Sequence, residues 1–179
     1  MIDLLSLTSH FKPLNDHESQ AAWFRTLLPW VGPEAYLNVI HKPAPPGLLF
    51  NVAQRWHFPE EIVDFLERQN GAMLFCGALN LYGVVEPARL LNREDTFSLP
   101  PFNIEDENAS WAFQRDRLLV VGGYMFDGSR TCIDRSDSHI HIFKKGQRIP
   151  TASWPSFETW LVEEISRLRT LFDGEGRKI

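Results

Sequence analysis

The stretch from Leu118 to Phe143, LLVVGGYMFDGSRTCIDRSDSHIHIF, decides the fold class of this 179-residue chain. It contains runs of β-branched and aromatic residues separated by turn residues, which is typical of consecutive antiparallel strands. Asp127-Gly128 predicts a two-residue hairpin turn, in which both central residues have positive φ. A second turn at 135–137 leads into a strand over Ser138–Phe143. The stretch therefore predicts a meander of three strands.

Two shorter strands are expected before the meander. Ala72–Cys76 and Ala78–Gly83 are apolar and flank a turn residue, Gly77. Within the first strand of the meander, Gly122-Gly123 predicts a bulge or a close backbone approach. A phosphate-binding loop is not expected there, because such a loop lies between a strand and a helix, and another strand follows here.

Helical patterns precede and follow these strands. The clearest begins at Pro59, which suits the first position of a helix, and ends before Asn70-Gly71. The other predicted helices cover Asn15–Leu28, Leu48–Trp56 and Phe157–Leu171, the last capped by Ser156. The order of elements predicts an α+β fold, with an antiparallel sheet that has a central meander and is packed by helices on one side.

The proline-rich stretch Lys42–Gly47 suggests a boundary. We expect an N-terminal helical appendage over residues 1–44, a main domain over 45–172 and a flexible tail over 173–179. Tyr36–Ile40 fits either a short strand or a helical turn. Pro87–Leu91 fits one helical turn, and the polar, aperiodic stretch Asn92–Ser110 predicts a surface loop.

The composition indicates an ordinary globular protein and excludes a disordered or fibrous one. Hydrophobic residues make up 44% of the chain and charged residues 23%, with a net charge of −5. The sequence has no Lys/Arg-rich run that would predict nucleic-acid binding, and no apolar run long enough to predict a membrane span. The N-terminus lacks a basic signal-peptide region, so we expect a cytoplasmic protein. Cys76 and Cys132 are expected to be buried, free thiols.

The motif search predicts no catalytic centre, no metal and no cofactor. His139 and His141 alternate in a strand and share one face, where Asp134 or Asp137 could join them as metal ligands. The alternative is a polar outer face of the strand, with Ile140 and Ile142 pointing inward. Nothing resembles a GxSxG nucleophile motif, and the paired carboxylates on helices suit solvated faces.

A group of acidic residues within the predicted surface loop is the candidate partner-binding site. Its members are Glu94, Asp95, Glu105, Asp106 and Glu107. An acidic loop can receive a basic partner surface and accelerate the encounter. The alternative is a loop whose charges serve solubility alone.

Four motifs, in consistent order from about Leu48 to Leu171, resemble those of the SUKH superfamily. Phe58-Pro59-Glu60-Glu61 with Phe65-Leu66 and Asn70-Gly71 resembles its "LPxx…FL…NG" signature. The other three motifs are Leu79–Gly83, similar to an "lxLYG" strand; Gly122–Asp134, similar to the family's central hairpin; and Ser156–Leu161, similar to an "SFxxWL" helix.

The resemblance implies an α+β domain that binds proteins and has no shared catalytic residues. Many bacterial members are immunity proteins that neutralise polymorphic toxins, often nucleases. We therefore expect a non-enzymatic protein that binds and blocks a toxin domain, without nucleic-acid or membrane partners. The alternative is a regulatory protein-interaction module without a toxin, like the fungal branch that regulates cell-wall glucan synthesis.

Overall fold

The structure is a computed structural model that describes residues 4, 7, 13–14, 19–24, 36–75, 77–86, 101–111, 113–172 and 179. The helices with defined bounds are α2 (Pro46–Trp56), α3 (Glu60–Arg68), α4 (Ile104–Ser110) and α5 (Phe157–Arg169). The strands are β1 (Pro13–Leu14), β2 (Ser19–Phe24), β3 (Tyr36–His41), β4 (Ala72–Leu74), β5 (Leu79–Leu81), β6 (Leu118–Gly123), β7 (Arg130–Asp134), β8 (Ile140–Phe143) and β9 (Ala152–Trp154).

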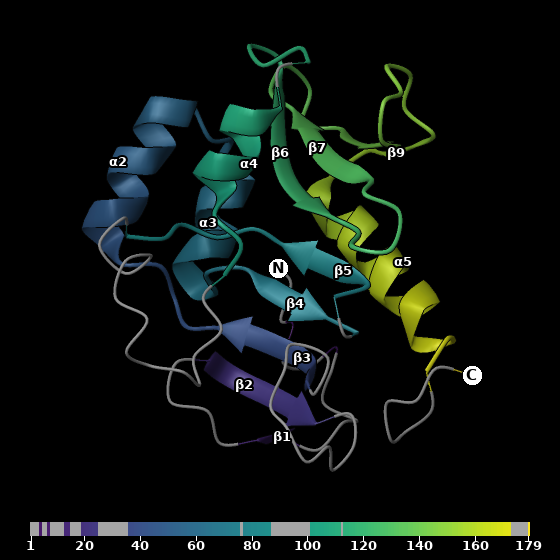
Figure 1. The fold of residues 1–179 in the computed structure, drawn as a ribbon. Coiled ribbons are helices and arrows are strands. Elements are labelled where there is room, and N and C mark those ends of the chain that lie inside the picture. The colour runs from purple at the N-terminus through teal and green to yellow at the C-terminus, as the bar shows by residue number, and fades with distance from the viewer. Residues whose placement is uncertain are drawn as a thin grey trace.

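The described strands form one sheet in chain order, and each pairs antiparallel with its neighbours (Figure 1). The predicted meander is its β6–β7–β8 section, in which Ile133 pairs with both Leu119 and Ile140. Helices pack against this sheet around one hydrophobic core. The predicted α+β fold with an antiparallel meander sheet is therefore confirmed.

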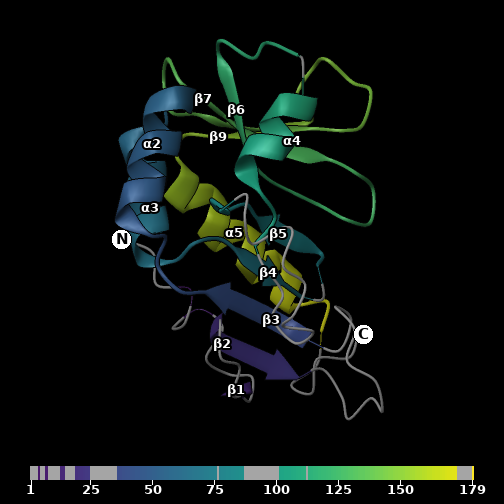
Figure 2. The same ribbon diagram turned by 60° about the vertical axis from the view of Figure 1, so that its left-hand side comes forward.

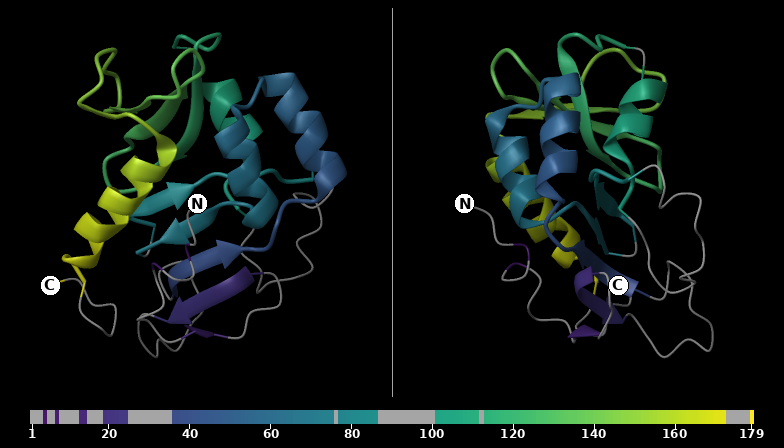
Figure 3. Two further views of the ribbon diagram at one scale, coloured as in Figure 1. Left: turned by 180° about the vertical axis from the view of Figure 1, so that it is seen from behind. Right: turned by 90° about the vertical axis from the view of Figure 1, so that its left-hand side faces the viewer.

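Helices α3 and α5 come together on the same side of the sheet, as the view from behind in Figure 3 shows. The rings of Phe65 and Phe157 meet edge to face with centroids 5.1 Å apart. The predicted helix at the C-terminus begins as expected, because Ser156 accepts a hydrogen bond from the backbone N–H of Thr159. Trp160 and Leu161 are fully buried on its inner face.

The helix predicted over Asn15–Leu28 is wrong where the structure describes this segment. Ser19–Phe24 is strand β2, which pairs with β3 (Tyr36–His41), so residues 19–24 and 36–41 are not part of a helical appendage. A short apolar run with capping residues fits the periodicity of a helix or of a strand. Here pairing with the distant strand β3 makes it a strand. β3 also pairs with β4, and Ile40 lies in the core with no exposed surface.

The loop of the β6–β7 hairpin is also longer than predicted. Tyr124 and Ser129 close it through a backbone N–H to C=O bond of 3.0 Å, which leaves a four-residue loop from Met125 to Gly128. Gly128 has positive φ, at 69°, but Asp127 does not. Asp127 instead accepts a hydrogen bond from the N–H of Ser129 through its carboxylate.

The predicted close backbone approach at Gly122 is confirmed. The β6–β7 register shifts between Val120 and Gly122, which marks a bulge. A Cβ at Gly122 would lie 2.6 Å from the carbonyl oxygen of Asn80 on β5. The glycine therefore allows β5 to reach the bulged strand.

Candidate partner-binding site

The predicted surface loop contains a helix where the structure describes it, so that prediction is wrong over Ile104–Ser110. Asn103 caps α4 by accepting a hydrogen bond from the N–H of Glu105 at 3.1 Å. The three consecutive acidic residues lie in the first turn, where the helix dipole favours negative charge. Glu94, Asp95 and Pro87–Leu91 lie outside the described residues.

Helix α4 is fixed to the edge of β6 by a buried amide. The side chain of Asn108 donates to the carbonyl of Val120 and accepts from its N–H, both at 2.8 Å. These are the bonds that a neighbouring strand would supply, and β5 pairs only further along, at Gly122 and Gly123. Figure 2 shows α4 beside β6. The acidic residues are therefore held on a rigid element.

Two of the three carboxylates on α4 pair with arginines. Glu105 accepts hydrogen bonds from Arg55 at 2.8 Å and from the indole N–H of Trp56 at 2.9 Å, which ties α4 to α2. Glu107 pairs with Arg130 of β7 at 2.9 Å. Asp106 is exposed and accepts from the side-chain amide of Asn103. Of the three, Asp106 is best placed to meet a partner.

Next to the Glu107–Arg130 pair lies the phenol of Tyr82. Burial raises the pKa of Tyr82, and the negative charge of Glu107 raises it further, although Arg130 acts in the opposite direction. The phenol is thus neutral at physiological pH. Its ring lies 6.0 Å from that of Phe102, which is 40% exposed beside α4.

A cluster of aromatic rings covers the adjoining part of the sheet. We call it the aromatic face; it consists of Trp111, Phe113, His139, His141 and Phe143. Neighbouring ring centroids are 5.8 to 6.5 Å apart. The guanidinium of Arg148 lies 6.0 Å from the centre of the Phe113 ring. Phe143 is buried, and the other four rings are partly exposed.

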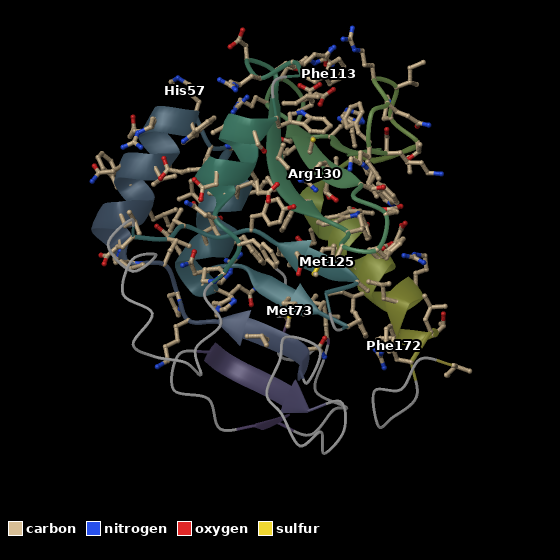
Figure 4. The ribbon with its side chains drawn as sticks, viewed as in Figure 1. His57, Met73, Phe113, Met125, Arg130 and Phe172 are labelled. Carbon is tan, nitrogen blue, oxygen red and sulfur yellow. The ribbon has the colours of Figure 1, made fainter. Side chains whose placement is uncertain are left out.

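Figure 4 shows how the labelled members of this region lie, with Phe113 and Arg130 over strands β6 and β7. Arg130, Cys132 and Asp134 share one face of β7, and the first two pair with Phe143 and His141. Burial raises the pKa of the Cys132 thiol to about 12, so it is a neutral core group. The prediction of a buried, free thiol is confirmed for Cys132, whereas Cys76 lies outside the described residues.

The segment that contains most of the aromatic face is rich in cations. Residues 113–151 contain seven Lys or Arg and four Asp or Glu, so this segment carries +3 in a chain whose net charge is −5. Lys144, Lys145 and Arg148 are exposed and form no ion pair within the described residues. This local excess contrasts with the paired carboxylates of α4.

His139 and His141 share one face, as predicted, but that face is aromatic as well as polar. Their rings are stacked with centroids 6.5 Å apart. His139 lies 3.2 Å from the carboxylate of Asp137, and His141 lies 2.7 Å from the hydroxyl of Ser153. Asp134 instead receives hydrogen bonds from Arg117 and Ser136. In the described part of the chain, no three His, Cys, Asp or Glu side chains gather as metal ligands would.

The chain matches no known family model and no curated protein. Among the described helices, none is both long and apolar enough to cross a membrane.

The aromatic face was not predicted from the sequence. Its one local signal is the alternation of His139, His141 and Phe143 in a strand, which places the three on one side. Trp111 and Phe113 join them from the segment after α4, and no spacing rule predicts that contact. The cluster arises from the fold of the meander.

Proposed function

We propose that this chain is a non-enzymatic, protein-binding domain of the SUKH type, an immunity protein that binds and neutralises a bacterial polymorphic toxin. The observation that carries the proposal is the aromatic face beside the rigid, acidic α4. Protein interfaces are enriched in aromatic residues and arginine, which form most binding hot spots.

The residues that carry the family resemblance have structural roles that suit a shared scaffold. Phe65 and Leu66 are core residues of α3, and Trp160 and Leu161 are core residues of α5. The Asn70 side chain bonds both backbone groups of Val84, at 2.7 and 2.8 Å. Such residues support a stable frame on which surface residues can change to suit a partner.

Neutralisation would occur by steric occlusion, aided by charge. The partner would lie against α4 and the aromatic face and so cover its own active site. Asp106, with Glu94 and Asp95, would attract a basic patch on the toxin and speed association. Glu105 and Glu107 would act mainly by holding α4 in place through Arg55 and Arg130.

An affinity pull-down of the tagged chain from its host's lysate, read by mass spectrometry, tests this proposal. We expect to recover the toxin domain of a large secreted protein, whose activity then falls to zero at one equivalent of this chain. Reproducible recovery of housekeeping proteins alone would favour the regulatory module instead.

The role of Asp106 can be tested on the recovered complex. We expect Asp106→Lys to slow association about tenfold at low salt and much less at high salt, because screening removes the long-range attraction. Glu67→Lys, which makes the same charge change at an exposed site on α3, is the matched control. Equal association rates for the two variants would remove α4 from the interface.

A further inference from the structure

We propose that the aromatic face, with Lys144, Lys145 and Arg148 around it, receives a carboxylate-bearing segment of the protein partner. The inference rests on the proposed function and adds a second contact of opposite charge to the acidic α4. It assigns the chemistry of the partner surface: aspartate or glutamate side chains presented beside apolar groups.

The first argument is the charge of the region. The two exposed lysines and Arg148 form no ion pair within the described residues, whereas Glu105 and Glu107 are already paired. Cations without partners at the rim of an interface favour an acidic surface and repel a basic one. The partner would meet cations here and an anion at Asp106, and this pair of opposite contacts would fix its orientation.

The second argument is the contact chemistry of the rings. Arg148 lies over Phe113, where a guanidinium can keep its cation–π contact and still donate to a carboxylate. Trp111 and Phe113 are partly exposed and rest on the buried Phe143, so they are rigid before a partner arrives. Rigid aromatic side chains lose little entropy on binding.

The ring geometry favours a protein over a single-stranded nucleic acid. Trp111 meets Phe113 at 85°, and Phe143 meets Phe113 at 69° and His141 at 68°. These three pairs thus meet edge to face, whereas base stacking needs open, flat faces.

Site-specific photo-crosslinking tests the inference. The full chain would carry benzoylphenylalanine in place of Phe113 or, as the control, of Phe50, which is 65% exposed on α2. Both proteins would be irradiated in the host lysate beside a wild-type pull-down, after circular dichroism has shown that they are folded. We expect an adduct at position 113 only, joined to an acidic segment of the protein that the pull-down recovers.

A charge reversal gives a second readout that replaces no aromatic side chain. We expect Arg148→Glu to reduce the yield of the adduct about tenfold, and the matched Arg169→Glu on α5 to leave it unchanged. Lack of an adduct at 113, an adduct on a basic segment or on nucleic acid, or equal yields for the two reversals would each overturn the inference. An acidic partner that is not a toxin would keep the inference and refute the immunity function.

Discussion

At the scale of single residues, Asn70 shows how one side chain replaces a missing strand. Its amide serves both the N–H and the C=O of Val84, and it is 8% exposed. Asn70→Ala would leave two buried backbone groups without partners, each costing about 1–3 kcal/mol, so we expect a loss of roughly 2–6 kcal/mol of unfolding free energy. Urea titration followed by tryptophan fluorescence measures this loss.

The matched control is Asn51→Ala, an exposed position within α2. Alanine has the higher helix propensity, so this variant should be neutral or slightly stabilising. If Asn70→Ala and Asn51→Ala lost similar amounts of unfolding free energy, the hydrogen bonds of Asn70 to Val84 would not contribute to stability.

Asp134 provides a residue-scale prediction about pH. Burial alone would raise its pKa, but hydrogen bonds from Ser136 and Arg117 and the charge of Arg117 outweigh burial, so the pKa lies below its ordinary value of 3.8. The unfolded chain therefore binds this proton more readily, and the stabilisation is present at neutral pH and lost as the pH falls below about 4.

We expect Asp134→Asn to lower the melting temperature at neutral pH and to flatten its decline in acid. Thermal unfolding from about pH 7 to about pH 3 measures both effects. Asp137→Asn, at a half-exposed carboxylate in the next turn, is the control. If the melting temperatures of the wild type and Asp134→Asn fell equally as the pH was lowered, Asp134 would not contribute to the loss of stability in acid.

At the scale of elements, the junction of β5 and β6 depends on Gly122. An alanine there would place its Cβ 2.6 Å from the Asn80 carbonyl, so the strands must separate or the backbone must shift. We expect Gly122→Ala to cost about 2–4 kcal/mol, as overpacking of a core does or somewhat more. Gly47→Ala is the control, because a Cβ at Gly47 in the first turn of α2 has nothing within 4 Å.

Gly47→Ala should be neutral or stabilising by up to about 1 kcal/mol. Both variants can be compared by chemical denaturation. If Gly122→Ala were as stable as Gly47→Ala, the close approach of β5 to β6 would not exist in solution.

Elements with local signals could be predicted from the sequence. Helices α2, α3 and α5 each have an apolar stripe; α5 also has the cap Ser156, and α3 has acidic residues in its first turn and Arg68 in its last. The glycine-flanked strands β4 to β7 have turn residues at their ends. Helix α4 has the cap Asn103 and acidic residues in its first turn, but only two inward residues, Ile104 and Asn108. Without an apolar stripe, its seven residues resemble a polar loop. Strand β2 owes its conformation to β3, and no local pattern contains that partner.

At the scale of the whole molecule, the candidate site combines segments that are distant in sequence. Its acidic residues on α4 could be predicted from the sequence, because three consecutive carboxylates stand out there. Their internal pairing with Arg55 and Arg130 could not, since these partners are 50 and 23 positions away from Glu105 and Glu107. The aromatic face has the same origin, because Trp111 and Phe113 reach Phe143 only through the meander.

The whole molecule also bears on the boundary expected near residue 44. Ile40 on β3 and Leu74 on β4 are both fully buried in the common core, together with Leu4. If residues 36–41 are integral to the domain, Ile40→Ala should cost about 2–5 kcal/mol, as Leu74→Ala should. Ile149→Ala, at a 78% exposed position, should have little effect.

Urea unfolding distinguishes an integral β3 from an appendage. An integral strand gives one cooperative transition in every variant, with equal slopes and with midpoints lowered by Ile40→Ala and Leu74→Ala alike. A separate N-terminal unit gives two transitions, of which Ile40→Ala lowers only the smaller one. We expect the single transition, because the pairing of β3 with β4 makes the sheet and its core continuous across the proline-rich stretch.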